Sequence, residues 1–175
     1  MNTIRIDLEE LIIALEGQAD FGEFFLDKES GEIILVSDYT DDDADTKRQR
    51  FNEQPNRFLY IRPLASNAGW EIMADFVQTV DNSDAKNSLE GALQGRKPFR
   101  SFKDQLLDFP DIRDKWFAYH AHKMNEIAQD WLEENDISFV ETKTALATSH
   151  FIVRWPKIST TKQKMTPARK TNQRL

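Results

Sequence analysis

Apolar residues recur every three or four positions through most of the stretch from Ser66 to Asn135. This spacing places them on one face of a helix, so the stretch predicts a row of amphipathic helices. We expect the first helix to be capped by Ser66, the next two to begin at Asp84 and after Pro98, and the longest to run from an Asp111 cap to about Asn135. The predicted apolar stripes are Trp70, Met73, Ala74, Val77 and Val80; Leu89, Ala92 and Leu93; Phe99, Phe102 and Leu106; and Ile112, Trp116, Tyr119, Ile127 and Trp131.

The first 61 residues predict a different kind of structure. Asp7 is expected to cap a short helix that ends at Gly17. The apolar runs 23–26 and 32–36 flank an Asp-Lys-Glu-Ser-Gly turn, a pattern typical of a β-hairpin. A loop with a short helix is expected over 37–53, and a third strand over 58–61. Further strands are expected near 137–140 and 151–155. The predicted class is therefore α+β, mostly helical, with a small antiparallel sheet made of the hairpin plus one or more strands.

The composition limits the chemistry that the chain can carry. It has no cysteine, which excludes disulfides, thiolate nucleophiles and cysteine-based metal centres. The N-terminal stretch lacks the features of a signal peptide, and no apolar run is long enough to span a bilayer. We therefore expect a cytoplasmic protein that does not use a membrane as a partner.

Charge divides the chain into an acidic body and a basic end. Thirty acidic and fifteen basic residues precede Lys143, a net charge near −15, whereas eight basic residues and no acidic one follow from there. The stretch 156–175 is polar, basic and almost free of large apolar groups, which predicts a disordered tail. We expect residues 1–155 to form one globular domain, and the tail to meet something anionic, which includes the body itself as an alternative.

The segment from Gly95 to Leu106 is basic and aromatic. Arg96, Arg100 and Lys103 recur at helical spacing, and guanidinium groups in such a row suit carboxylate or phosphate. The predicted partner-binding residues are Arg96, Lys97, Arg100, Lys103, Arg113 and His120. The alternative is that these cations pair with carboxylates of the acidic body.

His120 is expected at the apolar stripe of the longest helix, beside Trp116 and Met124. It could titrate or contact a ligand there, or simply be a core-edge histidine with one hydrogen bond. His120 and His122 point to different sides of a helix and cannot share a metal. The acidic stretch 38–45 resembles the start of a calcium loop but has Thr46 where that loop needs glycine, so we interpret it as a solvated loop. We expect no metal and no cofactor.

Four pieces of the chain resemble uncharacterised protein family 0158, a bacterial family: the LDKESGEI hairpin, the WEIMADFVQTV helix, GRKPFRSFKDQL, and DKWFAYHAHKMNEIAQDWLEEN. The likeness covers residues 3–137 with order and spacing intact. It implies a similar domain and assigns no activity, cofactor or site residue.

Three functions follow from these residues. The first is a non-catalytic binding or adaptor module for an anionic partner, which we expect to be a protein because the acidic body repels nucleic acid. The second is weak nucleic-acid binding through the tail, independent of base sequence and sensitive to salt. The third is an enzyme of unknown class with His120 as proton carrier; no G-x-S-x-G, P-loop, G-x-G-x-x-G or H-E-x-x-H motif is present to name its reaction.

Overall fold

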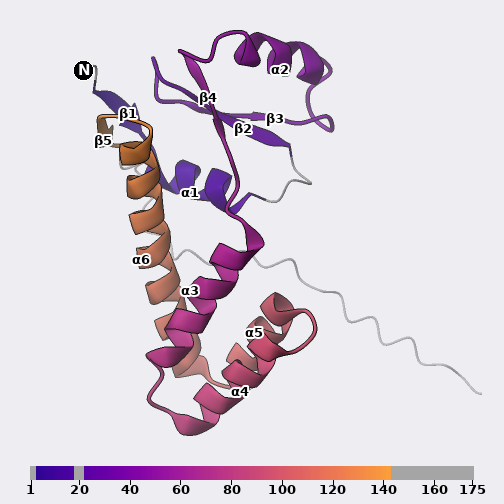
Figure 1. The fold of residues 1–175 in the computed structure, drawn as a ribbon, viewed down its shortest axis with the longest axis vertical. Coiled ribbons are helices and arrows are strands. Elements are labelled where there is room, and N and C mark those ends of the chain that lie inside the picture. The colour runs from indigo at the N-terminus through magenta and orange to yellow at the C-terminus, as the bar shows by residue number, and fades with distance from the viewer. Residues whose placement is uncertain (1–2, 18–21, 143–175) are drawn as a thin grey trace, which may run out of the picture. The chain divides into compact units, whose positions relative to one another are not determined.

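The structure, a computed structural model, describes residues 3–17 and 22–142. The chain divides into two units, Met1–Thr144 and Ala145–Leu175, and all of the described residues lie in the first. Their elements follow in the order β1 (Ile4–Ile6), α1 (Leu8–Glu16), β2 (Glu23–Asp27), β3 (Ile33–Val36), α2 (Ala44–Asn52), β4 (Phe58–Ile61), α3 (Ser66–Gln78), α4 (Ser83–Gln94), α5 (Pro98–Leu106), α6 (Pro110–Glu134) and β5 (Phe139–Glu141), as Figure 1 shows. The predicted α+β class, with helices predominating, is confirmed.

The predicted hairpin and third strand form one antiparallel sheet of order β3-β2-β4. In the central strand Phe25 pairs with Ile34 on one side and with Tyr60 on the other. The turn closes through a 2.7 Å hydrogen bond from the Gly31 amide to the carbonyl of Asp27. Gly31 has a φ of 80°, the left-handed conformation that the hairpin prediction required of it.

The two faces of this sheet bury different clusters. Strand residues alternate between faces, so Phe25 and Phe58 point to one side while Leu26 and Ile61 point to the other. The first side packs with Phe51 of α2 in a small aromatic cluster, in which the Phe51 and Phe58 ring centroids are 4.2 Å apart. The second side joins the main core formed with α1, α3, α4, α5 and α6.

A parallel strand pair, which the sequence analysis did not predict, joins the two ends of the described domain. β1 pairs with β5, with Ile4 opposite Phe139 and Ile6 opposite Glu141. The predicted strand at 137–140 is therefore real but begins and ends slightly later. Ile4 and Ile6 are buried, which anchors this pair in the main core.

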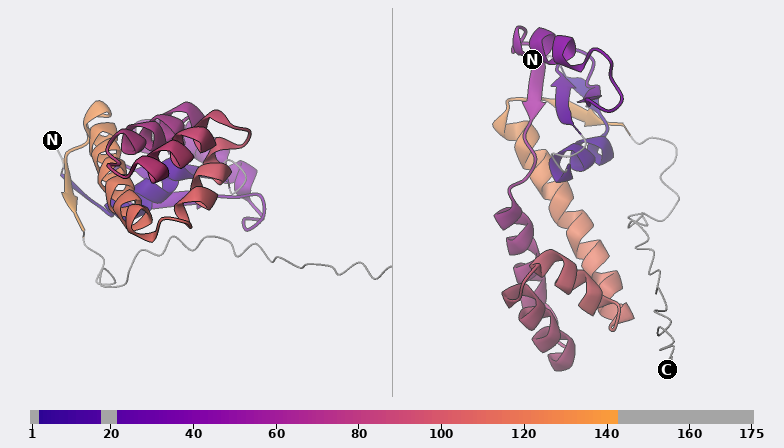
Figure 2. Two further views of the ribbon diagram at one scale, coloured as in Figure 1. Left: turned by 90° about the horizontal axis from the view of Figure 1, so that it is seen from below. Right: turned by 90° about the vertical axis from the view of Figure 1, so that its right-hand side faces the viewer.

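The four long helical segments that the apolar spacing predicts are all present. α4 and α5 run back against each other next to α3, and α6 contacts α1, α3 and α5, an arrangement that can be followed in Figure 2. Two predicted caps are wrong by one or two positions. Ala65, not Ser66, precedes α3, and Phe109, not Asp111, precedes α6, because Pro110 occupies the first helical turn.

The aromatic stripes pack less uniformly than predicted. Trp116 is buried, and Tyr119, Ile127 and Trp131 pack partly buried against the core. Trp70 and Phe99, however, remain 39% and 38% exposed. The expected strand at 151–155 and the tail lie outside the described residues.

Within the described ranges, no helix combines the length and apolar character that crossing a membrane requires.

Candidate functional site

The turn between α4 and α5 presents the predicted basic residues. α4 ends at Gly95, whose amide bonds the carbonyl of Ala92 at 3.3 Å, and α5 begins with Pro98 in its first turn. Lys97 lies between them in the left-handed conformation, with φ 57° and ψ 56°. A side chain in that conformation costs about 1–2 kcal/mol, so the fold holds this turn against a local preference.

Two partly exposed aromatic rings lie beside this turn. The Trp70 indole N–H donates to the carbonyl of Leu93 in the last turn of α4, at 3.3 Å. Phe99 covers Gly69 of α3, because a Cβ atom there would lie only 3.2 Å from the Phe99 ring. We call Trp70, Arg96, Lys97, Phe99 and Arg100 the basic-aromatic corner.

The cations of the corner have little internal neutralisation. The Arg100 Nε lies 3.7 Å from the Asp104 carboxylate, and both side chains are about 60% exposed, at 61% and 60%. Such exposed pairs contribute little. Within residues 3–17 and 22–142, the side chains of Arg96 and Lys97 form no hydrogen bond or ion pair. The alternative in which the body's own carboxylates occupy these cations is therefore not what the described residues show.

Lys103, two turns into α5, belongs to a second group of charges. Its charge acts on Glu16 at the end of α1 and on His120 in α6. The His120 Nε2 lies 3.2 Å from the Glu16 Oε1, and the imidazole packs 5.0 Å from the Trp116 ring. We call Glu16, Lys103 and His120 the three-helix cluster.

Burial shifts all three ionisations in this cluster toward the neutral form. Desolvation lowers the pKa of His120 below its usual 6.5, and the Lys103 charge adds to that effect. Desolvation also lowers the pKa of Lys103, although Glu16 opposes it. The pKa of Glu16 is raised by desolvation, with Lys103 in opposition. Desolvation therefore favours the neutral imidazole of His120, whose Nε2 lies 3.2 Å from the Glu16 Oε1.

The structure divides five of the six predicted residues between these two sites. Arg96, Lys97 and Arg100 lie together in the corner, and Lys103 and His120 lie in the three-helix cluster. Arg113 joins neither group through a contact: its Nε lies 3.8 Å from neighbouring Asp114. The predicted row of Arg96, Arg100 and Lys103 is not uniformly exposed: Arg96 lies before α5, Arg100 is 61% exposed, and Lys103 is partly buried.

Sequence reasoning missed three residues of these sites. Glu16 lies just before the predicted helix end at Gly17, and no neighbouring residue in the sequence indicates that it lies beside His120. Trp70 and Phe99 were assigned to the core because their spacing matches an apolar stripe. Both lie in the first half of their helices, and apolar spacing alone does not show that they stay partly exposed.

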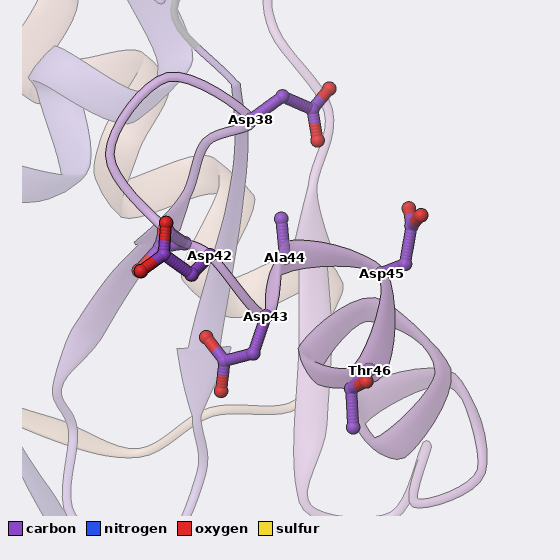
Figure 3. A pocket seen from close by; sticks show the side chains of 7 residues that line it. Asp38, Asp42, Asp43, Ala44, Asp45 and Thr46 are labelled. Atoms are coloured by element: carbon purple, nitrogen blue, oxygen red, sulfur yellow. The ribbon is translucent and has the colours of Figure 1, made fainter.

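The acidic loop before α2 forms an open depression with a volume of about 310 Å³, lined by Asp38, Asp41, Asp42, Asp43, Ala44, Asp45 and Thr46 (Figure 3). The labelled carboxylates in Figure 3 point in different directions rather than toward one point. Lys47 binds Asp41 at 2.5 Å and Asp43 at 3.1 Å, and Arg48 binds Asp38 at 2.7 Å and Asp45 at 3.0 Å. Four of the loop's five carboxylates therefore pair with Lys47 or Arg48 of α2.

The comparisons with known proteins agree with the resemblance and extend it. The model of the uncharacterised protein family UPF0158 matches residues 1–154, beyond the 3–137 expected from the motifs. UPF0158 protein PA5073 of Pseudomonas aeruginosa is 36% identical over 138 residues, which cover 78% of this chain and 87% of that protein. No solved structure matches the chain. The chain therefore belongs to uncharacterised protein family 0158.

Proposed function

We propose that this domain is a non-catalytic binding or adaptor module that docks an acidic segment of a protein partner on the basic-aromatic corner. The observation that carries the proposal is the pair of exposed cations, Arg96 and Lys97, that have no ionic partner among the described residues. They lie in a body whose net charge before Lys143 is near −15. Because no carboxylate of the described residues neutralises these two cations, they can bind a carboxylate that a partner supplies.

The two rings of the corner support a protein partner. Arg and Trp side chains dominate the energetic centres of protein interfaces, because they combine large apolar area with directed hydrogen bonds. Trp70, whose indole binds the Leu93 carbonyl near the end of α4, and Phe99, at the start of α5, offer such area near the turn that carries Arg96 and Lys97. A segment with carboxylates flanking one apolar side chain would therefore match the corner.

The turn is also held rigid before any partner arrives. Pro98 restricts the start of α5, and the Ser101 hydroxyl donates to the Arg96 carbonyl at 3.2 Å. A preorganised turn loses little conformational freedom on binding, so more of the contact energy remains as affinity. We place this interaction in the cytoplasm, since a cysteine-free chain suits a reducing compartment.

The test is charge reversal with a matched control. The immobilised wild-type chain, R96E/R100E and R50E/R62E are incubated with lysate, and recovered proteins are identified and quantified by mass spectrometry. Arg50 and Arg62 are exposed and lie outside the corner, so both variants change the charge equally. We expect R96E/R100E alone to lose acidic partners that R50E/R62E retains. Equal recovery by both variants, with circular dichroism showing folded protein, would refute the proposal.

Nucleic-acid binding through the basic end is separated by a second measurement. Gel-shift titrations compare the full chain with a chain ending at residue 156, each at low and high salt. Tail-dependent, strongly salt-dependent retention of DNA would favour that function over the corner. If retention is absent and partner recovery still requires Arg96 and Arg100, the protein-docking function is supported.

A further inference from the structure

We infer that the outer edge of β3 is a docking site for an extended, basic segment of a protein, which pairs with it as an added β-strand. β3 is the outermost strand on one side of the sheet of order β3-β2-β4 (Figure 1). The inference does not rest on the docking function of the basic-aromatic corner, because β3 contributes no residue to that corner.

The backbone groups of Ile33 and Leu35 form this edge. The Asp27 amide donates to the Glu32 carbonyl at 2.9 Å, so these two residues are a hydrogen-bonded pair of the β2–β3 ladder. Hydrogen-bonded and non-hydrogen-bonded pairs alternate along an antiparallel ladder, so Ile33 and Leu35 turn their N–H and C=O groups away from β2. Within the described part of the chain, no strand or loop bonds these outward groups. We call these four groups the β3 edge.

β3 lacks the features that keep an edge strand unpaired. Its sequence is Ile-Ile-Leu-Val, which contains no lysine and no proline, and its register with β2 is regular, without a bulge. Edge strands of natural proteins commonly carry a charge, a proline or a bulge, because their unpaired N–H and C=O groups otherwise attract another strand. Their absence from β3 favours an edge that receives a partner strand.

The side chains along the edge offer that strand an apolar surface. Leu35 lies opposite Phe24, whose ring packs against the end of α1: a Cβ atom on Gly17 would lie 3.0 Å from it. Leu35 itself is 40% exposed, and Ile33, on the same face, packs partly buried against the main core. An apolar residue of an added strand opposite Leu35 would therefore extend the layer that Phe24 and Leu35 begin.

The charge around the edge favours a basic partner. Glu32 directly precedes β3, and its charge reaches Glu10 of α1: burial first, then Asp7 and then Glu32, raise the pKa of Glu10. Among the residues that the structure describes, neither Glu10 nor Glu32 has a side-chain ion pair. The acidic stretch 38–45 follows the other end of β3. A lysine or arginine at the end of an added strand would be attracted here, whereas a second copy of this chain would bring the same negative charge.

The experiment measures whether a strand-forming peptide covers the β3 edge. The probe is a synthetic seven-residue peptide in which valine and threonine alternate between two terminal lysines. Amide hydrogen exchange of the full wild-type chain is followed residue by residue by NMR as this peptide is added. We expect the Ile33 and Leu35 amides to exchange rapidly in the free protein and about tenfold more slowly at about ten times the dissociation constant, because exchange then requires the unbound state.

Two control peptides separate backbone pairing from charge. One has every amide N-methylated and cannot pair with a strand, and the other has glutamates in place of both lysines. We expect neither to slow exchange. Protection by the N-methylated peptide would refute strand addition, and equal protection by the glutamate peptide would refute the basic partner. Two results would overturn the docking site itself: no change up to the solubility limit of the lysine peptide, or slow exchange of Ile33 and Leu35 before any peptide is added, because the edge is then already occupied.

A pair of proline variants locates the edge. L35P removes an outward amide of β3 and leaves the bonds to β2, since proline lacks only the N–H that faces away. Y60P is the matched control on β4: Tyr60 is 42% exposed and lies opposite Phe25, which bonds β3 instead, so its amide also faces away from β2.

We expect L35P to weaken binding of the lysine peptide about tenfold and Y60P to leave it unchanged, because only L35P removes a donor and an apolar contact of the docking edge. Weaker binding in Y60P with normal binding in L35P would move the site to β4 and overturn the proposal. The exchange measurement uses the wild-type chain and decides the question even if a proline variant unfolds.

Discussion

The imidazole of His120, in the middle of α6, lies 3.2 Å from the carboxyl group of Glu16, the last residue of α1. Burial first, and the charge of Lys103 second, keep the pKa of His120 below its usual 6.5. The folded state therefore binds fewer protons than the unfolded chain just below that value. Stability contributed by neutral His120 is present above the unfolded pKa and is lost as the pH falls through the folded one.

We expect H120Q to flatten the pH dependence of the free energy of unfolding between about pH 5 and pH 7.5. Urea denaturation across that range measures it. H122Q is the matched control, because His122 is 71% exposed and pairs with Glu126 one turn along the same helix. The raised pKa of Glu16 makes the free energy of unfolding change with pH in the opposite direction, but in a lower pH range. If H120Q and H122Q give the same slope, His120 does not titrate with folding.

Gly31, in the hairpin turn, should not tolerate replacement by alanine. A Cβ atom on Gly31 would lie 1.9 Å from the Arg5 carbonyl oxygen, and the φ of 80° disfavours any side chain. We expect G31A to lower the free energy of unfolding by about 3 kcal/mol, because the turn and β1 must both move. G91A is the control: a Cβ there meets nothing within 4 Å on helix α4, and we expect a gain of up to about 1 kcal/mol. Chemical denaturation of both variants measures whether the free energy of unfolding falls in G31A and rises in G91A.

The Asp27–Arg57 pair should be a stabilising contact of the sheet. Asp27 is only 4% exposed and accepts from Arg57 Nη2 at 2.8 Å and from the Glu29 amide at 2.9 Å. Burial opposes ionisation, but these hydrogen bonds outweigh it and lower the pKa of Asp27. We therefore expect D27N to cost about 2 kcal/mol near neutral pH, and the difference from wild type to shrink as the pH falls below the usual range of aspartate. A constant difference down to strongly acidic pH would contradict this account.

Lys97 should show a conflict between stability and binding. Replacement by glycine removes the steric cost of the left-handed conformation, so we expect K97G to stabilise the fold by about 0.5–1 kcal/mol. The same change removes one charge of the corner and should weaken partner recovery. K115G, in the helical conformation of α6, should instead destabilise by about 1 kcal/mol and leave recovery unchanged. Thermal denaturation and the pull-down, run on both variants, test the two effects separately.

The elements of this domain were predicted where their signals are local. The stripes of α3 to α6, the Asp7 cap and the glycine turn after β2 depend on residues within about one or two turns of each other. The errors also have local causes. Pro110 displaced the predicted cap at Asp111. Trp70 and Phe99 match an apolar stripe but remain 39% and 38% exposed.

The sequence by itself determined the class of fold, the helices, the hairpin and the concentration of positive charge around Pro98, because periodicity, turn chemistry and net charge are properties of short segments. Only the tertiary structure decided that β1 pairs with β5, that Lys103 is partly buried, and that Glu16 lies beside His120. These relationships join residues far apart in the chain, and their partners are selected by how helices pack around Trp116 and the main core. The spacing of residues within one segment does not predict which distant segment it packs against.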